Sequence, residues 1–312
     1  MFIVLHDAWR PHPLAWIHRR EARQIARELS RSGHAVRRAA FGRSAIADSS
    51  AGRNVLRLSD PVMFEAVEAL SSAKVPYIGP GFETMKRCYD KYAAGRILAA
   101  GGFTCPQTEL GTEADRIEFP VVIKPRWGSD SIGIARYAHG PVPTRKRSER
   151  YVVQRYIRGS DITIGVLNGQ AGVPLHIRIP DDTLYTFARK YVLRPRIVPV
   201  AEQRLATRVR EEAVRIAAAL GVDWAARIDF IHEPGADMLY FLECDVAPLV
   251  GRGSAFDTSL KAAGIARSEQ LKRLFLTYEC GSRRSTGWAA ENRLWPICEC
   301  RQASARGPKQ KS

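Results

Sequence analysis

Carboxylates interrupt two otherwise apolar segments in the last third of the chain. We expect two strands there, at about 225–232 and 238–245, joined by EPGAD, which is typical of a hairpin loop. Because side chains alternate between the faces of a strand, Arg227 and Asp229 share one face. By the same alternation Glu243 and Asp245 share a face of the second strand. If Asp229 pairs near Glu243, three carboxylates and one guanidinium converge.

Two interpretations of this cluster follow from its chemistry. Three clustered carboxylates repel one another and are costly to remove from water, and a divalent cation relieves both penalties. Oxygen ligands suit Mg²⁺ (or Mn²⁺), so Asp229, Glu243 and Asp245 are candidate metal ligands. The alternative is a solvent-facing ladder of ion pairs, in which Arg227 pairs with Asp229 and nothing is bound.

A second candidate site is VVIKPRWGSDSIGI (121–134), where an apolar strand delivers Lys124 to a loop of small residues. Small residues expose backbone N–H groups that can bind phosphate, and the lysine adds a compact positive charge. The loop is neither a Walker A motif nor GxGxxG. Its candidate phosphate-binding residues are Gly128, Ser129, Ser131 and Gly133. The alternative is an ordinary turn.

Two further lysines stand out because the chain has few. The 48 basic residues include only 10 lysines. Lys91 follows Asp90 at the start of an expected helix, and Lys190 lies in ARKYV. Each of these lysines, taken alone, is compatible with a solvated surface residue. They become candidate site residues because of their order along the chain with Lys124 and the acidic hairpin.

The elements that must position these residues follow from the hydrophobic pattern. Strands at 2–5, 53–58 and 75–80 with helices at 14–32 and 59–70 predict a parallel α/β unit over about 1–84. The remaining expected elements are helices at 86–101, 204–220 and 257–278 and strands at 120–124, 151–157 and 161–167.

Composition narrows the class of protein. The chain has 312 residues, a formal net charge of +16 and six cysteines without a CxxC pair. No apolar run is long enough for a transmembrane helix, and the cysteines favour a reducing cytoplasm. The charge alone raises a polyanion partner, but no stacking-aromatic motif, zinc finger or helix-turn-helix supports specific nucleic-acid binding.

The order of the motifs resembles the ATP-grasp superfamily and, within it, the D-alanine–D-alanine ligase branch. The matching segments cover about 57–275 and are DPVMFEAVEAL…VPYIGPG, YDKYAAGRILAAGGFTCPQT, FPVVIKPRWGSDSIGI, YVVQRYIRGSDITIGVL, LYTFARKYV, ARIDF and FLECDVAP. The resemblance implies an N-terminal α/β domain over 1–84, a small ATP-grasp subdomain with a phosphate lid over 85–157, and a C-terminal subdomain with the metal site over 158–278. A flexible basic tail would follow at 279–312.

The resemblance also implies a role for each candidate residue. Lys91 and Lys124 would hold ATP phosphates under the lid of Gly128, Ser129, Ser131 and Gly133; Gln154, Tyr156 and Ile157 would line the adenine pocket; Asp161 would bind the ribose; Lys190 would reach the γ-phosphate. Asp229, Glu243 and Asp245 would ligate Mg²⁺, Arg227 would stabilise the acyl phosphate and tetrahedral intermediate, and Ser254 would contact the carboxylate of the second substrate.

The activity implied is that of an ADP-forming carboxylate–amine ligase with small-molecule substrates; no membrane is involved, and a homodimer is compatible with this. Several residues depart from the branch. HDAWRPHPLAW replaces the stretch that anchors the first alanine, Leu249 and Val250 replace Gly-Met, Asp245 stands where Asn is usual, and Asp130 adds a negative charge to the lid. We therefore expect a different amino-acid or small-acid substrate.

Other hypotheses remain alongside this one. The chain could ligate an amino acid to a peptide or protein acceptor, which a basic surface would suit if the acceptor is acidic. It could also be an inactive ATP-binding homologue. Further candidate specificity residues are His6, Asp7, His12 and His18 at the N-terminal end, Trp127 in the lid and Arg252 beyond the hairpin; the alternative is that they are ordinary loop and surface residues.

Overall fold

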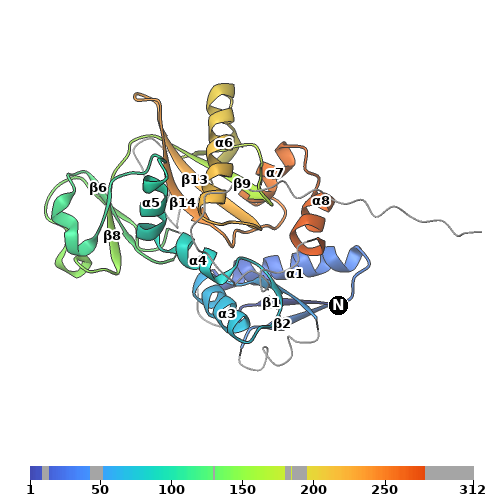
Figure 1. The fold of residues 1–312 in the computed structure, drawn as a ribbon. Helices are drawn as coiled ribbons and strands as arrows, with labels where there is room; N and C mark the ends of the chain where they lie inside the picture. Colours follow the sequence, from blue (N-terminus) through green and yellow to red (C-terminus); the bar gives the residue numbers. More distant parts are fainter. Residues whose placement is uncertain (9–13, 43–51, 129–130, 180–183, 185–194, 278–312) are drawn as a thin grey trace, which may run out of the picture.

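Three β-sheets organise the chain (Figure 1). The structure is a computed structural model that describes residues 1–8, 14–42, 52–128, 131–179, 184 and 195–277. Each sheet takes its strands from one of the three predicted segments 1–84, 85–157 and 158–278. The boundaries themselves stay predictions, and the expected tail over 279–312 lies outside the described residues.

The first sheet confirms the predicted parallel α/β unit. Its order is β2-β1-β3-β4, and its strands are β1 (Phe2–His6), β2 (Val36–Ala40), β3 (Arg53–Arg57) and β4 (Tyr77–Ile78). β1 is apolar on both faces, as expected of a strand covered on both sides. Phe2 and Val4 pack in one core with α1 (Ala15–Arg31). Ile3 and Leu5 pack in another with α3 (Asp60–Ser72).

The second sheet is antiparallel, and two helices precede it. Its order is β5-β8-β6-β7, with β5 (Thr108–Leu110), β6 (Val121–Pro125), β7 (Ala135–Tyr137) and β8 (Tyr151–Arg155). The single helix predicted at 86–101 is wrong: the structure has α4 (Phe82–Tyr89) and α5 (Lys91–Ala100). Asp90 separates them because its backbone is extended and its side chain accepts hydrogen bonds from the N–H groups of Tyr92 and Ala93, which caps α5.

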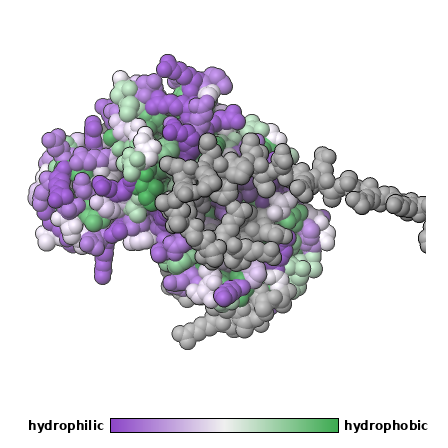
Figure 2. Space-filling view, viewed as in Figure 1, coloured by the Kyte–Doolittle hydropathy of each residue, from purple (hydrophilic) through white to green (hydrophobic). Residues whose placement is uncertain are grey.

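The third sheet carries the acidic hairpin. Its order is β12-β11-β9-β13-β14, with β10 beside β9. The strands are β9 (Ser160–Leu167), β10 (Gln170–Ala171), β11 (Leu175–Arg178), β12 (Arg196–Pro199), β13 (Ala225–Glu233) and β14 (Met238–Asp245). α6 (Gln203–Ala219) packs Leu205, Val209 and Ile216 into the core, as its pattern predicts. Its outer face, at the top of Figure 2, is largely hydrophilic.

The last described elements differ from the single helix predicted at 257–278. They are α7 (Ala255–Ala262), α8 (Arg267–Leu271) and a π-helical turn (Lys272–Leu276). α7 ends because Ile265 turns inward, is 6% exposed, and donates its N–H to the carbonyl of Leu260 at 3.0 Å. Within the described residues, no helix is long and apolar enough to cross a membrane.

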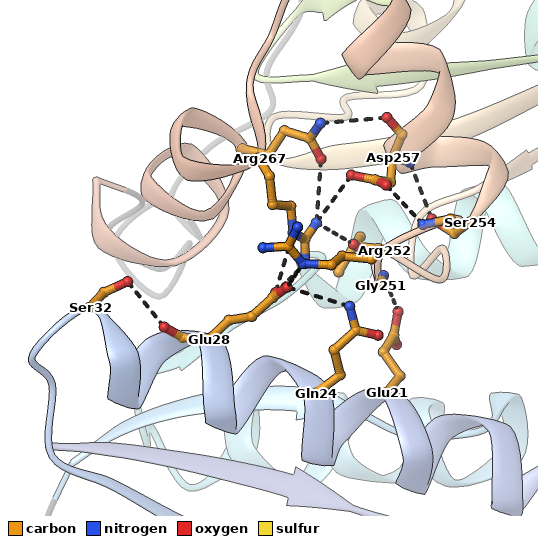
Figure 3. Close-up of polar contacts among 12 residues, drawn as sticks. Glu21, Gln24, Glu28, Ser32, Gly251, Arg252, Ser254, Asp257 and Arg267 are labelled. Atoms are coloured by element: carbon orange, nitrogen blue, oxygen red, sulfur yellow. Dashed lines mark hydrogen bonds and ion pairs between the residues drawn. The ribbon is translucent and has the colours of Figure 1, made fainter.

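A polar joint connects the first and last parts of the fold (Figure 3). On one side are Glu21, Gln24 and Glu28 of α1, and on the other are Gly251, Arg252 and Arg267. Glu28 accepts hydrogen bonds from Arg252 at 2.5 Å and from Arg267 at 2.6 Å. We call this set the α1 joint.

Acid is expected to weaken the α1 joint at Glu28. Burial alone raises the pKa of Glu28, but hydrogen bonds and charge from Arg267, with further bonds from Arg252 and Gln24, outweigh it and leave the pKa below the ordinary 4.5. A carboxyl group whose pKa is lower in the folded than in the unfolded protein stabilises the fold at pH values above its unfolded-state pKa. This stabilisation is lost as the pH falls through its folded-state pKa. The difference in unfolding free energy between wild type and Glu28→Gln should therefore be constant well above pH 4.5 and shrink below it.

Urea unfolding between pH 7 and pH 3 measures this difference. Glu83→Gln serves as the control, because Glu83 is exposed and its ion pair with Lys86 is long, at 3.6 Å. A Glu28→Gln difference that stays constant down to pH 3 would contradict the expectation.

Candidate functional site

The acidic hairpin forms in the register that the sequence suggested. β13 and β14 pair antiparallel, with Asp229 opposite Glu243 and Arg227 opposite Asp245. The register shifts between Asp229 and Phe230, so a bulge follows Asp229. The alternation of apolar and polar side chains on both strands thus places the four charged groups at one end of the hairpin.

Arg227 lies between two of the carboxylates. Its Nε and one Nη lie 3.2 and 3.3 Å from the two carboxylate oxygens of Asp229, and the same Nη lies 3.6 Å from Asp245. Thr163 of β9, which pairs with Asp229 across the sheet, donates its hydroxyl to Asp229 at 2.7 Å. The ion pair of the ladder interpretation is therefore present, and it lowers the repulsion between Asp229 and Asp245.

Glu243 differs from the two aspartates. Its Oε1 is buried without a hydrogen-bond partner among the described residues. A buried carboxylate oxygen without a partner is unfavourable, and a hard cation bound there would supply the missing interaction. The oxygen-only chemistry of Asp229 and Glu243 therefore fits Mg²⁺.

Asp245 fits less directly. Its Oδ1 accepts the N–H of Ala247 at 3.0 Å, while its Oδ2 faces Arg227. Across the part of the chain that the structure describes, no three His, Cys, Asp or Glu side chains are grouped closely enough to hold a metal ion. With Arg227 placed between the aspartates, the three-carboxylate metal site stays a prediction.

A cleft of about 830 Å³, including its open mouth, joins the hairpin to the second sheet. Eight predicted site residues line it: Lys124, Ser131, Gln154, Tyr156, Ile157, Asp161, Asp229 and Glu243. Lys124 at the end of β6 donates to the side-chain oxygen of Gln154 at 2.6 Å. Gln154 in turn donates to Thr108 at 2.9 Å, which fixes its amide orientation. Lys124 from the second sheet and three carboxylates from the third sheet, Asp161, Asp229 and Glu243, thus face one cleft.

The lid residues lie at the edge of this arrangement. Lys91 donates its Nζ to the carbonyl of Gly128, and its backbone N–H donates to Arg126 at 3.0 Å. Gly128 and Gly133 adopt positive φ angles of 103° and 75°, which glycine permits without strain. Asp90 forms an ion pair with Arg126 at 2.7 Å and so ties the start of the loop to α5. Ser129 and Lys190 lie outside the described residues, as does Asp130.

Some predicted residues do not line the cleft. Lys91, Gly128, Gly133, Arg227, Asp245 and Ser254 lie outside its lining. Ser254 caps α7 by accepting the N–H of Asp257 at 3.1 Å. The structure therefore gives Ser254 a local structural role, and its contact with a substrate stays a prediction.

The candidate specificity residues also have structural contacts. Asp7 is 1% exposed and accepts hydrogen bonds from the N–H and hydroxyl of Ser59. Trp127 in the lid lies edge-on to Phe64 of α3, with ring centroids 6.4 Å apart. Arg252 pairs with Glu28 in the α1 joint. His12 lies outside the described residues.

Sequence reasoning missed three residues at the site. Thr163 could have been found, because it lies two positions after Asp161 and so shares its strand face. The guanidinium carbon of Arg136 in β7 lies 4.0 Å from the ring centroid of Tyr156, which follows β8, and no local sequence pattern predicts this contact. Cys244 lies between the two acidic residues of β14 in the sequence, but its side chain packs in the hydrophobic core on the other face of the strand, where contact with the Cys88 thiol and burial raise its pKa well above 9.0.

One protein-family model and several known proteins match this chain. A family model described as "D-ala D-ala ligase C-terminus" matches residues 103–275. The D-alanine–D-alanine ligase of Syntrophotalea carbinolica is 27% identical over 223 residues, which cover 66% of this chain and 71% of that protein.

Two solved structures are similar in fold. The D-alanine–D-alanine ligase of Bacillus anthracis complexed with ATP has a TM-score of 0.72 and 18% identity, covering 88% of this chain and 95% of that one. The VanG D-Ala:D-Ser ligase of Enterococcus faecalis also has a TM-score of 0.72, with 17% identity and coverages of 88% and 97%. At these identities the two structures show the fold of the described chain.

Proposed function

Because the chain belongs to the D-alanine–D-alanine ligase family of ATP-grasp ligases, we propose that it joins a carboxylate to an amine through an acyl phosphate made from ATP. The observation that carries the proposal is the shared cleft. Lys124, Gln154 and Asp161 line it beside Asp229 and Glu243, so cation and carboxylates face one volume. Phosphoryl transfer needs this pairing, because charge builds on the transferring oxygens.

The proposed roles fall into two groups: some residues bind the phosphates of ATP, and others stabilise the acyl intermediate. Lys124 offsets phosphate charge at the end of β6, with Lys91 and Lys190 proposed for the same task. We propose that Arg227 stabilises the acyl phosphate and the tetrahedral intermediate that follows attack by the amine. Asp229 and Glu243, with Asp245, would hold Mg²⁺, which when bound supplies charge neutralisation at the phosphates.

The lid supports the chemistry by excluding water. An acyl phosphate exposed to water would be hydrolysed before the amine attacks. The contact of Lys91 with Gly128 ties the lid loop to α5, and the positive φ angles of Gly128 and Gly133 allow its sharp turns. Ser129 and Ser131 are proposed to bind phosphate from the same loop.

We propose that the substrates include an amino acid or small acid other than D-alanine. The first βα segment reads HDAWRPHPLAW, and its one described carboxylate, Asp7, is buried against Ser59 and so supports the fold. Leu249 and Val250 follow Pro248 where the branch has Gly-Met, and Val250 is fully buried. The reaction is proposed to take place in the cytoplasm, where ATP and free thiols coexist.

Release of ADP and phosphate tests this function. The purified protein should convert ATP to ADP and phosphate only when a suitable carboxylate and amine are both present. Phosphate release is screened over pairs of D- and L-amino acids with Mg²⁺, and products are identified by mass spectrometry. A peptide acceptor series extends the screen to the alternative of ligation to a peptide or protein.

Three outcomes would contradict parts of the proposal. AMP and pyrophosphate as products would exclude the acyl-phosphate route. ATP binding without turnover over every pair would favour an inactive homologue. Activity with D-alanine alone would contradict the proposed difference in substrate.

A further inference from the structure

Helix α1 carries two buried carboxylates on one face. Glu21 and Glu28 are seven residues apart, about two helical turns, and are 4% and 6% exposed. Both point from α1 toward the segment that follows β14 (Figure 3). Because charged side chains are rarely buried unless they are paired, the partners of these groups indicate what the burial achieves.

The partners of Glu21 include a fully buried guanidinium and a backbone group. Its Oε2 lies 2.6 Å from Nη2 of Arg57, whose side chain is 0% exposed at the end of β3. Its Oε1 accepts the N–H of Gly251 at 2.6 Å. Arg57 donates the same Nη2 to the carbonyl of Pro248, also at 2.6 Å. One ion pair within the N-terminal unit therefore holds the backbone after β14 at two points.

Stability alone does not account for this pair. Burying two charges costs roughly as much as their attraction returns, and an apolar pair of similar size often stabilises a fold equally well. The Nη1 of Arg57 is also buried without a hydrogen-bond partner among the described residues. What apolar side chains could not supply is the two directional bonds to Pro248 and Gly251.

The close packing around Gly251 is consistent with a fixed position for the 248–251 backbone. A Cβ on Gly251 would lie 3.1 Å from Gln24 and 3.3 Å from Glu21, so the glycine backbone lies close against α1. The 248–251 segment connects Asp245 and Ser254, which are two residues of the proposed site. Asp245 binds the N–H of Ala247 just before it, and Ser254 donates its N–H to Gly251 at 3.1 Å just after it.

We propose that Glu21 and Arg57 are positioning residues that fix the 248–251 backbone and thereby place Ser254 for the second substrate. The proposal rests on the proposed ligase function for its catalytic part. Neither residue is part of the cleft lining, and their hydrogen bonds to the segment go to backbone groups of Pro248 and Gly251. Its loss should therefore weaken use of the amine substrate and leave ATP binding unchanged.

The test removes the pair without leaving a buried charge. Glu21→Leu/Arg57→Met replaces both groups by apolar ones and should fold. Glu21→Gln/Arg57→Met keeps an acceptor for the N–H of Gly251 and serves as the partial rescue. Val209→Ala in α6, a fully buried position away from the joint, is the control for general destabilisation.

Two readouts separate the inference from the function it rests on. Hydrogen–deuterium exchange of a 246–256 peptide, in the full chain without substrates, should be faster in Glu21→Leu/Arg57→Met, slower again in the rescue, and unchanged in Val209→Ala. With an active acid–amine pair, KM for the amine should rise about tenfold, the effect of losing about one hydrogen bond, while ATP affinity stays within about twofold.

Either of two results would overturn the inference. One is wild-type exchange over 246–256 in Glu21→Leu/Arg57→Met, and the other is altered exchange with an unchanged KM for the amine. A wild-type protein that turns over no acid–amine pair would contradict the proposed function and with it the role of Ser254. Exchange over 246–256 would still decide whether Glu21 and Arg57 fix the segment.

Discussion

Asp229→Asn and Glu243→Gln are each expected to lower ATP turnover by about a thousandfold while the protein remains folded. Both changes keep the size of the side chain and remove its negative charge. If Asp229 and Glu243 hold Mg²⁺ against the phosphates, the lost stabilisation of transition-state charge is several kcal/mol. The measurement is turnover with an active acid–amine pair, alongside binding of Mn²⁺ as a spectroscopic probe.

The two variants should differ in stability. Asp229→Asn removes the carboxylate that pairs with Arg227 and accepts from Thr163, so it should destabilise the fold. Glu243→Gln should be close to neutral, because Oε1 of Glu243 is buried without a partner in the described structure. A loss of turnover in Glu243→Gln therefore cannot be attributed to unfolding.

The control lies on the same hairpin. Glu233 at the far end of β13 accepts a hydrogen bond from Tyr240 at 3.2 Å and does not line the cleft. Glu233→Gln should keep turnover within about twofold, the usual outcome away from the chemistry. Wild-type turnover in Asp229→Asn and Glu243→Gln would mean that the ladder of ion pairs, and not a metal site, describes this hairpin.

The hairpin was predictable because its pattern is local. Alternating apolar and charged residues identify both strands, and the short EPGAD connection leaves few registers, so the sequence could pose Asp229 near Glu243 as a condition, which the structure meets. The position of Arg227 did not follow. One guanidinium can pair with a neighbouring carboxylate on its own strand or leave the carboxylates to a cation, and no residue pattern distinguishes these outcomes.

Short strands, a helix boundary and long-range contacts were not predicted from the sequence, each for a different reason. β2 reads VRRAA, and β5 and β7 have three residues each, so none carries enough alternation to be detected. The helix predicted at 86–101 includes Asp90, whereas the capping bonds of Asp90 begin a separate helix at Lys91. The bond between Glu21 and Gly251 joins residues 230 positions apart, and only the packing of α1 against the segment after β14 brings them together.

Gly159→Ala is expected to lose about 3 kcal/mol or more of unfolding free energy. Gly159 lies between β8 and β9, where an added Cβ would lie 2.2 Å from the carbonyl oxygen of His232 and 2.6 Å from a methyl group of Ile231. Backbone cannot yield there as a flexible side chain can, so β9 and β13 must separate. Because Ile157 and Asp161 flank this glycine and line the cleft, ATP affinity should also fall, by tenfold or more.

Gly95→Ala is the matched control, because it makes the same chemical change where space is open. Gly95 lies within α5 and nothing lies within 4 Å of an added Cβ. Alanine at this helical position should raise the unfolding free energy by about 0.5–1 kcal/mol. Urea unfolding and ATP titration of both variants measure the contrast. A Gly159→Ala variant as stable as wild type would mean that the backbone at Gly159 does not pack as closely against His232 of β13 as the structure shows. It would then give no steric reason for the position of Asp161 in the cleft.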